Sequence, residues 1–146
     1  MTTILSCLLI SYRDEKLNLN KIQDENYNPL YSLLKENFGL QVKPYLTLYD
    51  EHSNEAKLKL SNYLDHMDTD SLVILELAAS LLKSTSLALL MLNQSIQPEE
   101  TLYYSRIEEI FQIKEYGHIE ENHSFDEKGI ENQLIALKLI WTLNVN

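Results

Sequence analysis

The apolar residues of this chain recur mostly at intervals of three and four positions, the spacing that places side chains on one face of an α-helix. This pattern predicts helices over residues 29–38, 54–67 and 124–141, and a polar connector over residues 13–25. The predicted apolar faces are Leu30, Leu33, Leu34 and Phe38 in the first helix, Ala56, Leu60, Tyr63, Leu64 and Met67 in the second, and Ile130, Leu134, Leu137 and Trp141 in the third.

Residues typical of helix ends support the first two boundaries. Asn28 is suited to cap the first helix, Pro29 to occupy its first position and Gly39 to end it. Ser53 or Asn54 is suited to cap the second helix. The chain has only three glycines and three prolines, a composition that favours long helices over β-hairpins.

Two further helices are marked in the carboxy-terminal half. One is expected to begin at Pro98 and to run as a single helix to Tyr116, with Gly117 as its stop. The last is expected to begin at Ser124, because Ser124 and Glu127 have the S-x-x-E spacing of a capping box.

Residues 71–82 are nearly all apolar, and Asp70 is placed to cap a helix there. The sequence KSTS at 83–86 predicts a break or kink, after which residues 87–92 continue as helix. A helix that is apolar on every side belongs in the interior. We therefore expect this segment at the centre of the domain.

Two short segments have the pattern of β-strands. Residues 3–12 form a short apolar run, and residues 40–49 alternate apolar and polar positions around Pro44, as in an edge strand. The predicted fold class is therefore mainly α (α+β): residues 1–146 form one helical bundle domain with a minor strand pair near the amino terminus.

The charge balance restricts the possible partners. Lys and Arg number 12 against 22 Asp and Glu, a formal net charge of −10, which disfavours nucleic acid and anionic lipid surfaces. The single cysteine, Cys7, excludes an internal disulfide. The apolar stretch 72–92 contains Glu76 and Lys83, so membrane insertion is not expected, and the amino terminus resembles no secretory or transit signal.

The densest polar stretch, residues 106–123, contains possible metal ligands. His118, Glu121 and His123 lie close together, but they lack the i, i+4 histidine spacing of a zinc helix and follow the helix stop Gly117. Exposed polar residues around a turn are the favoured interpretation. A metal-dependent hydrolase that uses these three residues is the remote competing hypothesis.

The acidic residues of the same stretch raise a second hypothesis, catalysis by paired carboxylates. Glu108 and Glu109, like Glu120 and Glu121, are adjacent in sequence, and adjacent residues on a helix point about 100° apart. No glycine-rich phosphate loop or nucleophile motif is present in the sequence. We therefore expect neither an enzyme nor a cofactor.

An amphipathic helix explains more of this stretch. Tyr103, Ile107 and Ile110, with Phe111 beside them, are predicted to face the core. Glu108, Gln112 and Glu115 are predicted to form a solvated face. The string that follows, from Tyr116 to His123, has no periodicity of this kind.

That string carries a family resemblance. SRIEEIFQIKEYGHIEENHS, residues 105–124, resembles the carboxy-terminal motif a-R-L-E-E-x-x-Q-x-x-x-W-G-x-V-E-x-x-H-D of the ATP synthase assembly chaperones of mitochondria and alphaproteobacteria, the ATP-twelve type. The matching residues are Arg106, Glu108, Glu109, Gln112, Gly117, Glu120 and His123. Residues 10–40 and 75–92 are similar to further family segments in the same order. Tyr116, Ile119 and Ser124 depart from the motif, where the family has Trp, Val and Asp.

The resemblance implies a chaperone that binds the free α subunit of the ATP synthase catalytic head and shields its β-facing surface. It implies a single domain equivalent to the carboxy-terminal part of the family, without the family's amino-terminal β-rich domain, located in the mitochondrial matrix or the alphaproteobacterial cytoplasm. The expected partner-binding residues are Glu109, Gln112, Tyr116, Glu120 and His123. A structural or adaptor subunit that retained the fold without chaperone activity is the alternative.

Overall fold

The structure, a computed structural model of the chain, describes residues 17–41, 54–117 and 123–145. Within these ranges it contains seven α-helices and no strand. They are α2 (Leu17–Phe38), α3 (Asn54–Asp65), α4 (Thr69–Leu82), α5 (Thr85–Leu92), α6 (Pro98–Ser105), α7 (Ile107–Tyr116) and α8 (His123–Val145). The mainly helical fold is confirmed. The strand pair stays a prediction, because residues 3–12 and all but the first two residues of 40–49 lie outside the described ranges.

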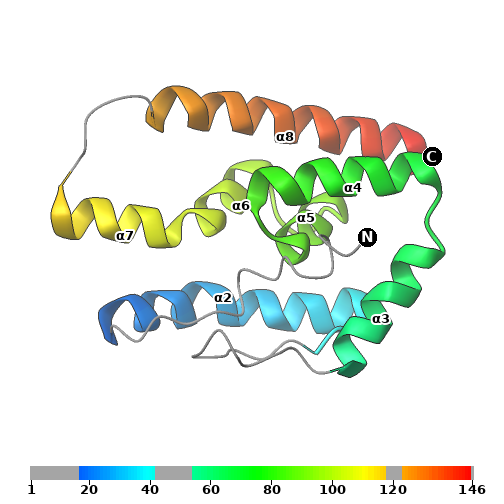
Figure 1. The fold of residues 1–146 in the computed structure, drawn as a ribbon, viewed down its shortest axis with the longest axis horizontal. Helices are drawn as coiled ribbons and strands as arrows, with labels where there is room; N and C mark the ends of the chain where they lie inside the picture. Colours follow the sequence, from blue (N-terminus) through cyan, green and yellow to red (C-terminus); the bar gives the residue numbers. More distant parts are fainter. Residues whose placement is uncertain (1–16, 42–53, 118–122, 146) are drawn as a thin grey trace.

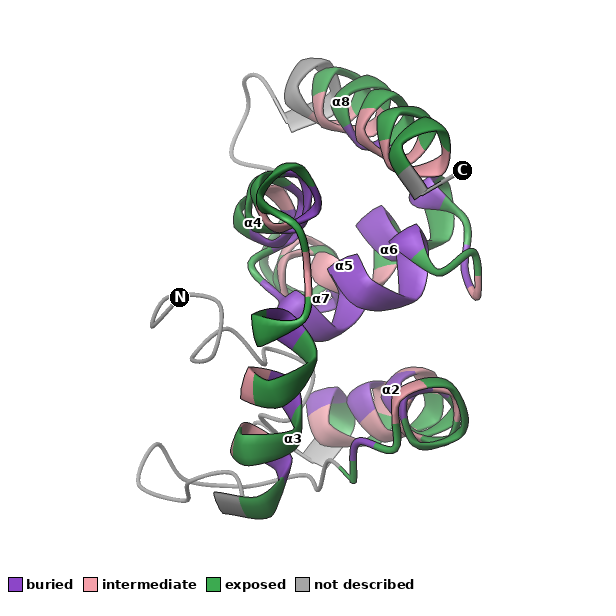
Figure 2. Cartoon of the chain, turned by 90° about the vertical axis from the view of Figure 1, so that its right-hand side faces the viewer, coloured by how far each residue is buried: buried purple, intermediate pink, exposed green. Residues whose placement is uncertain are grey.

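The helices are arranged in layers around α5. Helix α8 runs along one edge of the molecule beside α4, α2 runs along the opposite edge, and α5 and α6 lie between them (Figure 1). Helix α7 continues from α6 toward one end, and α3 closes the other end (Figure 1). Turned by 90°, the molecule shows its buried residues concentrated on α5 (Figure 2).

Helix α5 is buried because its sequence offers almost nothing to solvent. All eight residues of TSLALLML are buried. The predicted break before it is real: Lys83 ends α4 in the left-handed region with φ 53°, and Ser84 caps α5 by accepting a hydrogen bond from the Leu87 amide at 3.3 Å. Burying a Leu or Met side chain stabilises a fold by about 1.5–3 kcal/mol. This helix is therefore the centre of the core.

The prediction of an interior position was wrong for one face of α4. Ile74, Leu75, Ala78, Ala79 and Leu82 are buried. Val73 and Leu77, which lie on the opposite face, remain about half exposed. An apolar sequence therefore did not guarantee burial on all sides, because α4 packs mainly against α5 and α8 and this packing leaves Val73 and Leu77 only partly covered.

The expected connector before Asn28 was also wrong: α2 begins at Leu17, and Pro29 lies inside the helix. A proline in a helix interior costs about 3 kcal/mol. The cost is offset because Leu19, Tyr27 and Leu30 are all buried against the core, each contributing about 1.5–3 kcal/mol. The hydroxyl of Tyr27 also donates a hydrogen bond to the carbonyl of Tyr104 at 2.9 Å.

The cap of α4 is Asp68, two residues before the expected Asp70. Asp68 accepts hydrogen bonds from the Ser71 amide at 3.2 Å and the Ser71 hydroxyl at 2.6 Å. Asn144, near the end of α8, donates to Asp68 at 3.2 Å and to the Ser71 hydroxyl at 3.0 Å. This network fastens the end of α8 to the start of α4.

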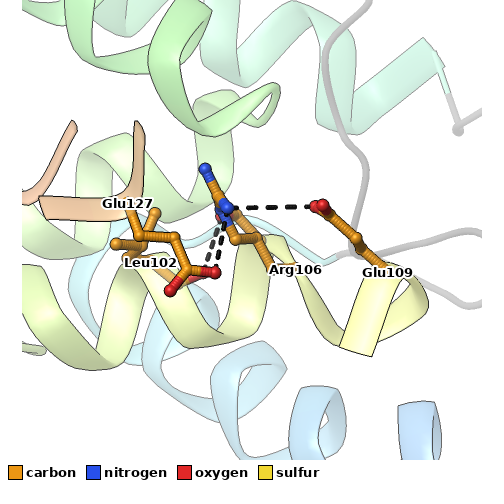
Figure 3. Close-up of polar contacts among 5 residues, drawn as sticks. Leu102, Arg106, Glu109 and Glu127 are labelled. Atoms are coloured by element: carbon orange, nitrogen blue, oxygen red, sulfur yellow. Dashed lines mark hydrogen bonds and ion pairs between the residues drawn. The ribbon is translucent and has the colours of Figure 1, made fainter. Parts of the chain in front are cut away.

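The single helix expected from Pro98 to Tyr116 is in fact two, α6 and α7, interrupted at Arg106 (φ −116°, ψ 12°). Arg106 donates from its guanidinium to the carboxylate of Glu127 on α8 at 3.0 Å (Figure 3). Its side chain is only 14% exposed. The guanidinium therefore joins the α6–α7 junction to α8.

Helix α8 begins at His123, one residue before the expected start. Its predicted inner stripe is confirmed: Leu134 is buried and Ile130, Leu137 and Trp141 pack against the core. In the part of the chain that the structure describes, no helix has both the length and the apolar character needed to cross a bilayer.

The Asp68 network predicts a pH dependence of stability. The Ser71 hydroxyl, the Asn144 amide and the Ser71 N–H lower the pKa of Asp68 below its ordinary 3.8. A carboxyl whose pKa is lower in the folded state stabilises the fold above its unfolded pKa, and this contribution is lost as pH falls through the folded pKa. Asp68→Asn retains a capping side chain but does not titrate.

We therefore expect wild type to have a higher free energy of unfolding than Asp68→Asn at pH 6. This difference should disappear as the pH falls below about 3.8, as measured by denaturant unfolding at each pH. The matched control is Asp70→Asn, two residues further on in the first turn of α4. An advantage of wild type over Asp68→Asn that is equal at both pH values would contradict this role of the network.

The Arg106 bridge predicts a second effect on stability. Arg106→Ala leaves Glu127 without its partner and removes a largely buried side chain, so the free energy of unfolding should fall by about 1–2 kcal/mol. The control is Lys128→Ala, which removes an exposed ion pair to Glu131 at 3.4 Å. That change should be below about 0.5 kcal/mol. Equal losses in the two variants, measured by urea unfolding, would rule out a structural bridge at Arg106.

Candidate functional site

Three of the five predicted partner-binding residues share the outward face of α7. Glu109, Gln112 and Tyr116 stand at positions i, i+3 and i+7, so they follow one another along one side of the helix. Ile107 and Phe111 are buried on the opposite side. Gln112 is exposed and Tyr116 is 73% exposed, which leaves both accessible to another protein.

The carboxylate of Glu109 is oriented by Arg106. Its Oε2 atom lies 4.0 Å from the Arg106 guanidinium, on the side of Arg106 away from Glu127 (Figure 3). The Glu109 side chain is 38% exposed, so this pairing is weak and leaves part of the carboxylate accessible. Arg106 thus links the α7 face to α8.

The adjacent Glu108 has a different role from the solvated one expected for it. It is half-buried, and its carboxylate accepts a hydrogen bond from the fully buried side chain of Gln23 on α2 at 3.0 Å. Glu108 and Glu109 therefore engage different partners on different sides of α7 and do not form a catalytic pair. Glu108 holds α7 against α2, while Gln112 and Glu115 are exposed as predicted.

The predicted apolar face of this region was only half right. Ile107 and Phe111 are buried, but Tyr103 is 47% exposed and Ile110 is 41% exposed. The break at Arg106 changes the helical register between Tyr103 and Ile107, and Ile110 lies at the edge of the face that Ile107 and Phe111 bury. The sequence contains neither Gly nor Pro at this point, so local signals gave no warning of the break.

The other predicted site residues are not placed by the structure. Glu120 lies outside the described residues, and of His123 only the backbone, which begins α8, is described. His118 and Glu121 of the metal hypothesis also lie outside. Among the described residues no group of three or more His, Cys, Asp or Glu side chains is arranged to hold a metal ion.

The conformation of Gly117 confirms the predicted stop of α7. Its φ of 84° is unfavourable for residues with a side chain, and its N–H donates to the Ile113 carbonyl at 2.8 Å. The chain therefore leaves α7 immediately after Tyr116, which puts that aromatic ring at the end of the helix.

The sequence analysis missed a second surface, on α8. Ile135, Leu139, Ile140 and Leu143 are all about half exposed or more, at 48%, 60%, 51% and 70%. A signal was available, since the sequence IALKLIWTL is apolar on more faces than one inner stripe requires. Contiguous exposed apolar residues are typical of surfaces that contact another protein.

No protein-family model matches the chain. Three solved structures share its fold. Atp12 from Paracoccus denitrificans superimposes with a TM-score of 0.83 at 22% identity, covering 93% of this chain and 59% of the Paracoccus chain. A variant of the same Paracoccus protein gives 0.85 at 21% identity, covering 96% and 60%. A candidate chaperone from Agrobacterium tumefaciens gives 0.78 at 18% identity, covering 94% and 52%.

The chain therefore spans somewhat more than half the length of the proteins it matches. At identities of 18–22% the likeness establishes a shared fold. The resemblance indicated by the motif at 105–124 is confirmed at that level: this chain has the helical fold seen in Atp12.

Proposed function

We propose that this protein is an assembly chaperone for the catalytic head of an ATP synthase, and that it binds the free α subunit and covers its β-facing surface. The observation that carries the proposal is the match of nearly the whole chain to Atp12, with a TM-score of 0.83 over 93% of its length. The sequence motif at 105–124 supports it independently, and two of its matching residues, Glu109 and Gln112, lie on the outward face of α7. Such a protein acts in the mitochondrial matrix or the alphaproteobacterial cytoplasm, where the enzyme is assembled.

The proposed mechanism is that the chaperone covers an exposed surface of the α subunit reversibly. A subunit that waits for its partner exposes an apolar surface, and such surfaces aggregate. The outward face of α7 offers Glu109, Gln112 and Tyr116 on a helix whose opposite side is fixed in the core. Tyrosine is enriched among residues that dominate protein interfaces, and an acid beside it favours a basic or polar partner group. The net charge of −10 also limits self-association.

Release needs no bound nucleotide in this proposal. The β subunit is more complementary to the same surface of α and displaces the chaperone by competition. The alternative, a permanent adaptor subunit, differs in one observable respect: it stays in the finished complex at fixed stoichiometry, whereas a chaperone leaves.

Co-expression with the α subunit of the same organism tests the proposal. Wild type should increase the soluble α subunit several-fold, and Glu109→Lys should remove most of that gain because it places a cation in the contact face. Glu36→Lys, the same charge change on an exposed position of α2, is the matched control and should retain the gain. If α remains insoluble beside folded wild type, the proposal fails.

Tyr116 gives a prediction with two separable readouts. Tyr116→Ala should weaken α-subunit binding about tenfold, because a large exposed aromatic contact is lost. Since Tyr116 is 73% exposed, the free energy of unfolding should change by less than about 0.5 kcal/mol. Leu58→Ala, at a 66% exposed position on α3, should change neither quantity. Unchanged α binding in Tyr116→Ala would remove this residue from the interface.

A further inference from the structure

A continuous groove runs along one side of α8, between that helix and the α6–α7 segment. It consists of two hollows of about 530 Å³ and 240 Å³ that share Glu99 and Glu131. The first is lined in addition by Gln97, Pro98, Ile135, Lys138, Leu139 and Thr142. The second is lined in addition by Leu102, Tyr103, Arg106, Ile110 and Glu127.

The floor and walls of this groove carry exposed apolar side chains. Tyr103 and Ile110 lie at one end, exposed by 47% and 41%, and Ile135 and Leu139 lie toward the other, exposed by 48% and 60%. These are four of the large apolar side chains that the described part of the fold leaves in solvent. A partner that fills the groove removes them from water, at about 25 cal/mol for each Å² of apolar surface.

Two carboxylates lie at the middle of the groove. Glu99 and Glu131 lie where the two hollows meet, and Glu131 pairs with Lys128 at 3.4 Å. The cations that line the groove are already engaged: Arg106 with Glu127 at 3.0 Å, and Lys138 with the side-chain oxygen of Gln97 at 3.1 Å. The groove therefore offers apolar contacts along its length and carboxylates at its centre.

The groove has the dimensions of a helix site. From Glu127 to Thr142 its α8 wall spans 16 residues, or about 22 Å at the rise of an α-helix. Both walls are helices, so they offer no sheet edge to which an extended peptide can hydrogen-bond. A helical occupant satisfies its own backbone and needs only apolar and charged side-chain contacts.

We propose that this groove binds an amphipathic helix of the client protein, with an apolar stripe facing Tyr103, Ile110, Ile135 and Leu139 and basic residues over Glu99 and Glu131. The inference deepens the proposed function and rests on it for the identity of the client. Charge selects the occupant: a second copy of this chain, also at −10, is repelled, whereas a basic helix is attracted.

The groove on the opposite side of α8 lacks this selectivity. It is lined by Leu77, Ser80, Leu81, Gln133, Ala136 and Leu137, and none of these residues is charged. Its apolar character alone does not indicate an occupant. It provides an internal comparison, because a nonspecific apolar ligand has no reason to prefer one side of α8 over the other.

The direct test uses the full chain and a fluorescein-labelled designed peptide of about 16 residues, with leucine on one helical face and lysine beside that face at mid-length, where Glu99 and Glu131 line the groove. We expect binding at physiological ionic strength, and affinity about tenfold or more lower for a peptide with Glu in place of Lys. Ile135→Asp should weaken binding of the lysine peptide about tenfold. The matched control is Ile140→Asp, the same change on the same helix outside this groove, with an exposed fraction of 51% against 48%.

Equal affinity of wild type and Ile135→Asp, equal losses in the two variants, or no binding of the lysine peptide would each overturn the groove site. In the α-subunit co-expression assay, Ile135→Asp should lose most of the gain in soluble α, and Ile140→Asp should keep it. If Ile135→Asp acts like wild type there, the groove is not the client site although the chaperone proposal stands. If wild type itself fails there, the chaperone proposal fails, and the peptide affinities still decide the groove.

Discussion

The burial of α5 is the constraint on which the rest of the structure depends. Eight consecutive buried residues must be covered on every side, and α2, α4, α6 and α8 all pack against this helix. Burial of α5 extends to Ser86, whose hydroxyl has no hydrogen-bond partner among the described residues. An unsatisfied buried hydroxyl costs about 1–3 kcal/mol. The leucines around it outweigh that cost at about 1.5–3 kcal/mol each.

Because the core is formed around a short helix, the other helices keep faces that the core does not cover. Helix α7 uses Ile107, Phe111 and the Gln23–Glu108 hydrogen bond to attach to the core, which leaves Glu109, Gln112 and Tyr116 outside. Helix α8 uses one stripe for the core and leaves apolar side chains on its other faces. Arg106 connects the two helices and keeps these faces in a fixed relation (Figure 3).

Local chemistry was sufficient to predict much of this fold. The stop at Gly117, the break at 83–86, the start at Pro98 and the inner stripe around Leu134 depend on backbone preference and helical spacing, which one sequence displays. The start of α2 was missed because Asn28 and Pro29 form a good helix start, yet burial of Leu19 and Tyr27 outweighs that preference. The break at Arg106 was missed because neither Gly nor Pro marks it, and the residue that Arg106 binds there, Glu127, is 21 positions away.

The candidate site likewise has a part that the sequence predicts and a part that only the fold brings together. The α7 stripe of Glu109, Gln112 and Tyr116 came from a motif and a helical period, and both are readable in the sequence. The α8 groove was not predicted, because its walls come from helices that meet only in the folded chain, with Glu99 and Glu131 brought together across the α6–α8 contact. The spacing of residues in one sequence does not predict such a tertiary contact.

We propose that a fixed helical core presents α7 and one side of α8 to an unassembled α subunit. Hydrogen–deuterium exchange of the protein, alone and with the purified α subunit, measures this directly. The account predicts slow exchange of α5 in both states and new protection of α7 and α8 in the complex, with α3 unchanged. Protection confined to α3, or no change at α7 and α8 in a complex that has formed, would contradict it.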